Sequence, residues 1–335
     1  MTVRVTRATR TSSVGIALVA VALIALIAAP YWAGREGMRL LIEVFVYLVL
    51  ASNWNLLAGY AGLVSVGQQA FVGLGGYVLF ALATLGGVPP LLCIPLAGVA
   101  AAVVAIPVAA ITFRLRGAYF AIGSWVVAEV FRLVASQISI LGGGSGTSLP
   151  AFIVTGMAHS RQAREFLVYW VALGLTVVIL GLIVALLRSR HGLALTAMRD
   201  NEVAARSNGI DVQRTKLLVF IFTAACTAMA GSLIFLQRLR ITPDSAFSVN
   251  DWTALVIFIT VIGGIGRFEG PFVGIVVFFV LRETLSDLGS IYLMILGAIA
   301  ILVMLKAPRG LWGFLAERTD AQVLPLQRRV RGLLR

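Results

Sequence analysis

The segment Phe166–Leu187, FLVYWVALGLTVVILGLIVALL, contains no charged residue and lies between Glu165 and Arg188. A helix needs about 20 consecutive apolar residues to cross a membrane, because each residue adds about 1.5 Å and the hydrocarbon core is about 30 Å thick. The segment also lacks the strict alternation of polar and apolar residues that marks a half-buried strand. It therefore predicts a transmembrane α-helix.

Comparable apolar segments recur on both sides of this one, and we expect about ten transmembrane helices, with eight or nine as alternatives. Two segments, at Ala70–Leu85 and Trp252–Ile265, are short and interrupted by glycine, so they are expected to be broken or re-entrant helices. The other expected spans are Val14–Trp32, Leu40–Leu57, Leu91–Phe113, Ala118–Ser136, Phe166–Leu187, Leu217–Leu236, Pro271–Leu288 and Tyr292–Leu305.

Composition agrees with an all-α polytopic membrane protein. Hydrophobic residues make up 60% of the 335 residues and charged residues only 12%. A soluble protein of this composition could not cover its surface with polar groups. A membrane β-barrel would need alternating segments of about ten residues, which the chain does not have.

The basic residues predict the orientation of the helices. The chain has 27 Lys and Arg against 14 Asp and Glu, and most of them fall in segments that share one side if the N-terminus is cytoplasmic. Both termini are then cytoplasmic, with basic ends at residues 1–13 and 314–335 flanking a membrane domain at 14–313. Basic residues in these places set topology and contact membrane lipid, so nucleic acid is not expected as a partner. The outer loops would hold Arg35, Arg39, Arg161, Arg164, Arg238 and Arg240.

The N-terminus has one other interpretation. Three arginines, an apolar run and Ala28-Ala29-Pro30 are similar to a secretory signal peptide. The run is long for a signal peptide and proline is unfavourable beside a cleavage site, so we interpret it as a retained first helix.

Catalytic and metal-binding chemistry is not expected. Cys93 and Cys226 lie inside apolar runs, and His159 and His191 have no cluster of ligand residues nearby. The nucleotide-binding P-loop requires lysine followed by serine or threonine, whereas Lys216 precedes leucine and Lys306 precedes alanine. We therefore expect no cofactor, no metal site and no catalytic residues, and any use of ATP must take place on a partner.

The longest polar segment on the inner side covers residues 188–216 and has the sequence RSRHGLALTAMRDNEVAARSNGIDVQRTK. Asp200 or Asn201 could cap a short helix that begins near Glu202, and Gly209 would end it in a left-handed conformation. The small residues Ala204, Ala205 and Ser207 would allow another protein to approach closely. The alternative is a solvated amphipathic helix on the membrane surface.

Glu202-Val-Ala-Ala205 followed by Gly209 resembles the coupling loop of ABC importer permeases. The stretch Ala197–Ile210 more narrowly resembles the branched-chain amino acid permease family, in its M-type subunit. Further segments resemble the same family in the same order: Asn55–Gly67 with Gln68 and Phe71-Val-Gly73, Leu115–Ile122 with Glu129 and Arg132, Gly142-Gly143 with Gly146 and Pro150, Val261–Gly266 with Gly270-Pro271 and Gly274, and Pro308-Arg-Gly-Leu311.

This resemblance implies a permease subunit of an ATP-driven importer for branched-chain or related amino acids, in a bacterial inner membrane. It implies a homologous permease partner, two ABC ATPase subunits that act through the 188–216 loop, and an extracytoplasmic solute-binding protein. Glu202, Ala204, Ala205 and Gly209 are then the candidate ATPase contact. An ABC permease for urea or short amides and an ion-coupled secondary transporter remain alternatives; the latter would need deep carboxylates such as Glu43 or Glu129.

Three further groups are candidates for function. Glycines that thin or break helices can free backbone groups to line a cavity, so Ser65, Gly67, Gln68, Gln69 and Gly73 are candidates for a translocation path. For any single glycine the alternative, close helix packing, is favoured. Glu129 and Arg132 share a helix face and are expected to form an intramembrane ion pair. Gly142, Gly143 and Gly146 would form an outer glycine loop, and Arg282 is expected to snorkel toward the membrane surface.

Overall fold

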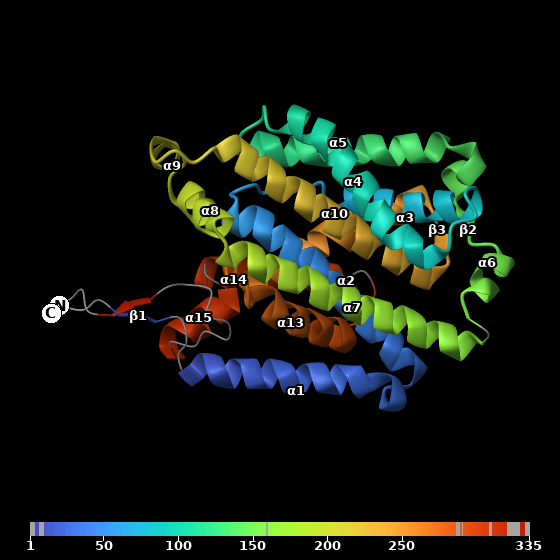
Figure 1. Cartoon of the computed structure of the whole chain (residues 1–335), viewed down its shortest axis with the longest axis horizontal. Coiled ribbons are helices and arrows are strands. Elements are labelled where there is room, and N and C mark those ends of the chain that lie inside the picture. Colours follow the sequence, from blue (N-terminus) through green and yellow to red (C-terminus); the bar gives the residue numbers. More distant parts are fainter. Residues whose placement is uncertain are drawn as a thin grey trace.

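The computed structural model is a bundle of long helices joined by short connections (Figure 1). It describes residues 4–6, 10–158, 160–285, 289, 291–307, 310–319 and 329–331. The helices are α1 (Arg10–Trp32), α2 (Gly34–Asn55), α3 (Gln68–Thr84), α4 (Pro90–Thr112), α5 (Ala118–Gln137), α6 (Ala151–Gly156), α7 (Arg161–Arg188), α8 (Arg190–Asp200), α9 (Glu202–Ser207), α10 (Val212–Arg238), α11 (Pro243–Ala246), α12 (Leu255–Gly263), α13 (Gly270–Leu285), α14 (Ile291–Lys306) and α15 (Gly310–Thr319). The short strands are β1 (Arg4–Thr6), β2 (Thr147–Ser148), β3 (Arg240–Ile241) and β4 (Arg329–Arg331).

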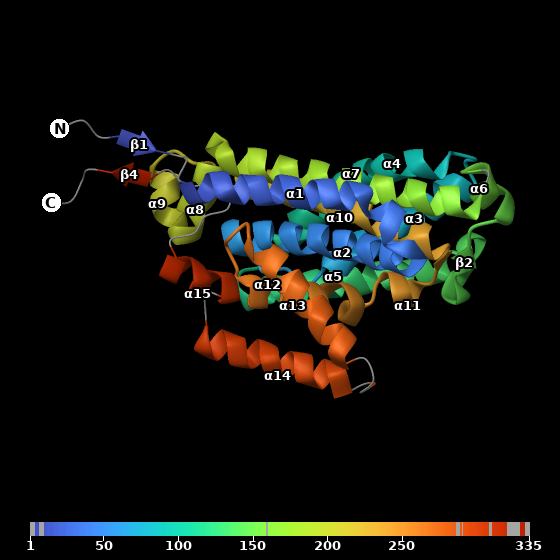
Figure 2. The same cartoon turned by 90° about the horizontal axis from the view of Figure 1, so that it is seen from below.

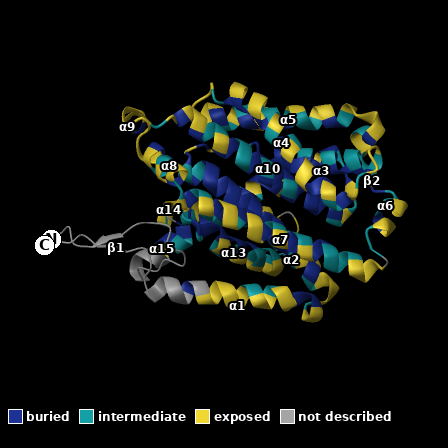
Figure 3. Ribbon diagram, viewed as in Figure 1, coloured by how far each residue is buried: buried dark blue, intermediate teal, exposed yellow. Residues whose placement is uncertain are grey.

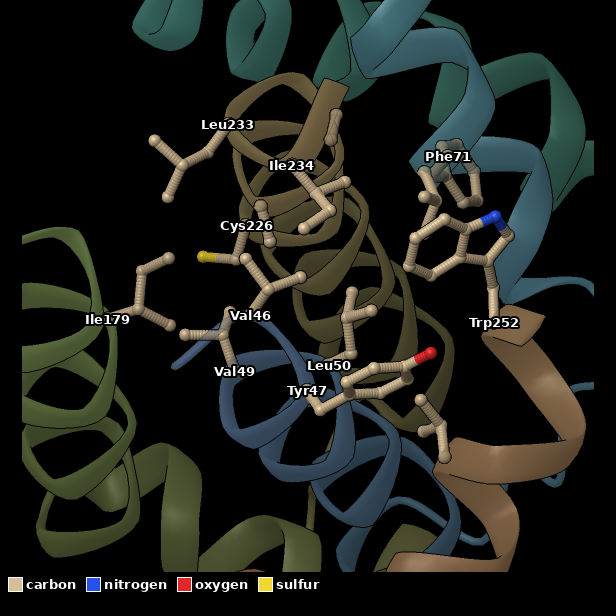
Figure 4. Close-up of a cluster of buried hydrophobic side chains, with 14 of the residues drawn as sticks. Val46, Tyr47, Val49, Leu50, Phe71, Ile179, Cys226, Leu233, Ile234 and Trp252 are labelled. Carbon is tan, nitrogen blue, oxygen red and sulfur yellow. The ribbon is translucent and has the colours of Figure 1, made fainter. Parts of the chain in front are cut away.

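The centre of the bundle is formed by α2, α3 and α10, and more than half of the residues of each of these helices are buried (Figure 3). Side chains such as Tyr47, Leu50 and Trp252 fill the space beside α10 (Figure 4). Helices α3 and α10 approach so closely that a Cβ at Gly75 would overlap the backbone carbonyl of Ala228, and one at Gly231 would overlap that of Val72. Small residues at such crossings allow the backbones to pack without an intervening side chain.

The outer helices expose apolar side chains. On α5 these include Ile122, Trp125, Val126 and Val130, and α1 and α14 show the same pattern (Figure 3). Within the described residues, seven helices are long and apolar enough to cross a membrane: Gly34–Tyr60, Pro90–Thr112, Ala118–Gln137, Arg161–Arg188, Val212–Arg238, Pro243–Gly263 and Ile291–Phe314. Shorter apolar helices occur at Ala17–Trp32 and Gln68–Thr84. The all-helical membrane architecture is confirmed, whereas the count of ten and the cytoplasmic termini stay predictions.

Two of the helices adjoin π-helical turns, whereas α3, which was expected to be broken or re-entrant, is continuous from Gln68 to Thr84. Helix α2 continues into a π-helical turn at Leu56–Tyr60, and residues 61–67 are not helical before α3 begins. Helix α12 is preceded by a π-helical turn at Val249–Ala254. π-Helical turns leave the regular i→i−4 hydrogen-bond pattern and are common at functional sites. Residues 286–288, at the end of the expected ninth span, lie outside the described residues.

The two ends of the bundle differ. At one end lie α8, α9, α15 and the antiparallel pair β1–β4, in which Val5 is opposite Val330 (Figure 1). At the other end lie α6, α11 and the pair β2–β3, in which Thr147 is opposite Ile241 (Figures 1 and 2). This division places the 188–216 loop and the glycine loop at opposite ends.

Candidate functional site

The connection from α2 to α3 is held by hydrogen bonds between side chains and backbone. The Trp54 indole donates to the Ser65 carbonyl at 2.8 Å, and the Gln68 amide nitrogen Nε2 donates to the Leu50 carbonyl at 2.8 Å. The Thr253 hydroxyl donates to Oε1 of Gln69, which links α3 to the π-helical turn before α12. The predicted path residues Ser65, Gly67, Gln68, Gln69 and Gly73 are therefore near one another, and all of them are buried.

Two of these glycines are sites of close packing. A Cβ at Gly67 would overlap the backbone carbonyl of Ser124, and one at Gly73 would overlap the ring of Phe247. Gly67 and Gly73 therefore lie where the chain packs closely in this conformation, and a role for them in the solute path stays a prediction. Any opening between these helices would require α3 to move relative to α5 and to the segment that carries Phe247.

Several buried polar atoms beside this connection have no hydrogen-bond partner. Asn53 is completely buried, and neither its amide nitrogen nor its amide oxygen is bonded. Most buried polar groups in proteins are hydrogen-bonded, and each unbonded group costs about 1–3 kcal/mol. The other unbonded atoms are Ser52 Oγ, Gln68 Oε1, Gln69 Nε2 and the Tyr77 hydroxyl. Sequence reasoning missed Asn53 because a single amide within a helix forms no recognisable motif.

The 188–216 loop contains two helices, α8 and α9, which lie at one end of the bundle (Figure 1). The Asn201 side chain caps α9 by accepting hydrogen bonds from the backbone nitrogens of Val203 and Ala204, at 2.9 and 3.0 Å. Gly209 follows with a φ of +79°, as predicted for a left-handed residue after the helix. Glu202 forms an ion pair with Lys216, which ties the start of α9 to α10.

The burial of Ala205 differs from the sequence prediction. Ala205 was expected on a small-residue face open to a partner, but it is only 2% exposed and packs against Met198 and Val212. Because α9 folds back on α8, this alanine becomes the core of the loop itself. The exposed residues of α9 include Val203, which is 75% exposed, together with Ala204 and Ser207.

Helix α8 also contacts the bundle through Arg199. One guanidinium nitrogen of Arg199 lies 3.4 Å from the carbonyl oxygen of Gly59, in the π-helical turn that ends α2. One turn earlier, Oδ1 of Asn55 accepts from the backbone nitrogen of Gly266 at 2.7 Å, and its Nδ2 donates to the Arg267 carbonyl at 2.8 Å. A displacement of α8 can therefore reach the end of α2 and the segment after α12 through direct contacts.

Glu129 and Arg132 form the predicted ion pair, with 2.8 Å between Nε and Oε1. Arg132 also bonds to Asp244 of α11 at 2.8 Å, so the pair links α5 to the end of the bundle that carries β2 and β3. A second ion pair was not predicted: Arg282 of α13 lies 3.0 Å from Glu43 of α2. Both deep carboxylates considered for ion coupling are thus paired with arginine.

We expect charge reversal at Arg132 to lower the amount of folded protein. Arg132→Glu would set three carboxylates together, at a cost of about 1–2 kcal/mol for this partly exposed cluster. The exchange Glu129→Arg with Arg132→Glu should restore stability only in part, because a carboxylate would then face Asp244; adding Asp244→Asn should restore more. The measurement is folded protein in the membrane by fluorescence-detected chromatography. Normal abundance with lost transport in every variant would instead assign the cluster to the solute path.

The glycine loop has the backbone geometry that its sequence predicts. Gly142, Gly143 and Gly146 have φ values of +83°, +51° and +73°. A Cβ at Gly146 would overlap the carbonyl of Ile241, so the loop lies directly against β3. This contact fixes the segment between α5 and α6 to the segment between α10 and α11.

Comparison with known proteins bears on what this arrangement does. Residues 38–304 match the family model described as the branched-chain amino acid transport system permease component. The chain belongs to this family. It is 31% identical to the LivM permease protein of the high-affinity branched-chain amino acid transport system of Escherichia coli K12, over 86% of this chain and 73% of the relative.

A more distant relative is also described as a branched-chain amino acid transport permease. The probable LivM permease of Methanocaldococcus jannaschii is 24% identical over 72% of this chain and 79% of the relative. The ribose import permease RbsC of Haemophilus influenzae is 31% identical over only 35% of this chain and 38% of the relative. No solved structure matches.

The chain is thus a multi-pass permease component of the ABC transport class and not the catalytic subunit. Within the described residues, no group of three or more His, Cys, Asp or Glu could hold a metal ion. Both cysteines are free and buried. His159, and Pro308 with Arg309 of the C-terminal motif, lie outside the described residues.

Proposed function

We propose that this permease imports a branched-chain or related amino acid, driven by ATP hydrolysis on partner subunits. The observation that carries the proposal is the match of residues 38–304 to the family, together with a helical α8–α9 loop that is capped at Asn201 and contacts the end of α2. The permease would pair with a homologous permease in a bacterial inner membrane. Two ATPases would bind at the α8–α9 end, and a solute-binding protein would bind at the end that carries the glycine loop.

The proposed solute path runs beside the connection from α2 to α3. Both amide atoms of Asn53, Oε1 of Gln68 and Nε2 of Gln69 are unbonded and offer donors and acceptors, which suit the ammonium and carboxylate groups of an amino acid. These groups are buried in the conformation described, so the path would open as the helices move during alternating access. In the open state the solute or water would satisfy the amides that are unbonded here.

The proposed mechanism starts at the loop. Closure of the ATPases would displace α9, and the Glu202–Lys216 ion pair would carry that displacement to α10. Arg199 would carry it to the Gly59 carbonyl, and Asn55 would carry it to residues 266 and 267. These contacts involve the π-helical turn, where the backbone has already left regular helical geometry.

Reconstitution into liposomes tests the proposal. The permease with its partner subunits should take up labelled leucine only when ATP and the binding protein are supplied, and a proton or sodium ionophore should have no effect. Uptake that survives without ATP and collapses with an ionophore would contradict the proposal in favour of secondary transport. ATP-dependent uptake of urea or a short amide, without uptake of leucine, would support ATP coupling but contradict the proposed amino-acid solute.

Labelling of introduced cysteines tests the proposed topology of ten spans with both termini in the cytoplasm. Cys93 and Cys226 are buried, so background labelling is expected to be low. Cysteines at Ser145 and Gln162, both exposed, should react with an impermeant thiol reagent added to intact cells, whereas one at Asn208 should not. Labelling of Asn208 from outside would contradict this topology.

A further inference from the structure

A pocket lies where the first turns of α2 and α7 meet the end of α10. Its wall carries four arginines, Arg35, Arg39, Arg161 and Arg164, which are four of the six basic residues expected in the outer loops. The apolar part of its lining consists of Met38, Ile42, Val168, Leu236 and Leu239. Such a convergence is unexpected on the side of a membrane protein where basic residues are normally few.

Three of the arginines share one partly buried carboxylate. Glu165 is only 16% exposed and lies 3.1 Å from Arg35, 3.3 Å from Arg161 and 3.9 Å from Arg39. The other carboxylate nearby is Glu36, which is exposed and 4.0 Å from Arg39. Four guanidinium groups therefore face two carboxylates, which leaves an excess of two positive charges around the pocket.

Arg164 makes no ion pair and no side-chain hydrogen bond within the described part of the chain, although it lines the pocket. Guanidinium groups bind phosphate oxygens with two parallel hydrogen bonds, and a charge-assisted bond of this kind is stronger than a neutral one. Glu165 holds three of the arginines in place, so the fourth is available to an anion from outside the chain.

The surroundings of the pocket indicate which anion. Tyr31 and Trp32, at the end of α1, are 83% and 67% exposed, and Tyr31 contacts Phe166 of α7 edge to face at 6.5 Å. Exposed tyrosine and tryptophan at the end of an apolar helix mark the level of lipid headgroups. The same helix exposes Leu18, Val21 and Ile24 along its length, which provides an apolar surface leading away from the pocket.

We propose that this pocket binds the headgroup phosphate of an anionic phospholipid, with the acyl chains along the apolar surface beside it. A soluble anion would use the arginines but would gain nothing from the apolar part of the lining or from the exposed aromatic residues at the end of α1. The lipid holds the starts of α2 and α7 together by neutralising the excess charge between them.

The test is lipid retention by the purified full-length permease, measured by native mass spectrometry and by thermal unfolding. Phosphatidylglycerol should be retained and should raise the unfolding temperature, whereas phosphatidylcholine and inorganic phosphate at the same concentration should not. Arg164→Gln should weaken retention of phosphatidylglycerol about fivefold. This variant strands no carboxylate, so folding should be preserved. Arg240→Gln removes an exposed arginine at the same end but outside the pocket and should have no effect.

Three results would overturn the proposal. The first is equal retention of phosphatidylglycerol and phosphatidylcholine. The second is stabilisation by inorganic phosphate equal to that by phosphatidylglycerol, which would assign the pocket to a soluble anion. The third is unchanged lipid retention in Arg164→Gln. If that variant also bound a soluble protein partner more weakly, the pocket would be a protein-binding site and not a lipid site.

Discussion

Ala204→Trp is expected to abolish transport while the permease stays folded in the membrane. Ala204 is exposed on α9 beside Val203, so a bulky side chain there would hold an ATPase away without disturbing the core of the loop. A loss of even 3 kcal/mol of contact energy lowers association by more than about a hundredfold. Copurified ATPase and ATP-driven uptake should therefore fall together, while the thermal stability of the permease alone stays unchanged.

Two variants make this result specific. Gln162→Trp places the same side chain at an exposed position on the opposite end of the bundle and should leave the ATPase bound. Ala205→Trp should instead lower the stability of the loop, because that residue is buried against Met198 and Val212. Normal ATPase binding and transport in Ala204→Trp would mean that α9 is only a solvated surface helix.

Asn53→Leu is expected to lower transport at least tenfold without destabilising the permease. Both amide atoms of Asn53 are buried and unbonded, so replacing them with an apolar side chain of similar size should leave stability unchanged or raise it by about 1–3 kcal/mol. If the Asn53 amide forms hydrogen bonds with the solute in an open state, its replacement should lower uptake. The measurement pairs thermal unfolding of the purified permease with uptake into liposomes.

Asn55→Leu is the matched control two residues along the same helix. Both polar atoms of its amide bond to the backbone, one to Gly266 and one to Arg267, so its replacement should lower the unfolding temperature. Loss of stability in Asn53→Leu to the same extent as in Asn55→Leu would contradict a solute role for Asn53. So would full transport activity in Asn53→Leu.

The sequence predicts features that depend on neighbouring residues. Hydropathy locates the long helices because each must be apolar along its whole length, as at Phe166–Leu187. The cap at Asn201 and the left-handed Gly209 follow from the chemistry of single residues close to a helix end. These predictions need no knowledge of how the helices pack.

Features that depend on distant residues were missed or misjudged. Ala205 is buried because α9 folds back on α8, and neither helix alone indicates that. Asp244 reaches Arg132 across 112 residues, and Glu43 reaches Arg282 between α2 and α13. The sequence also indicates that Asn53 is polar within an apolar helix, but only the packed bundle reveals that neither amide atom has a partner.

The most direct test of the central claim is site-specific photocrosslinking from α9 in the assembled transporter. A photoreactive amino acid at Val203, whose side chain is 75% exposed, should crosslink to the ATPase, and the yield should change when ATP is added. The same probe at Gln162 should give no ATPase crosslink. The account predicts an ATPase adduct at Val203 only; crosslinks from Val203 to lipid alone, with the assembled ATPase present, would contradict it.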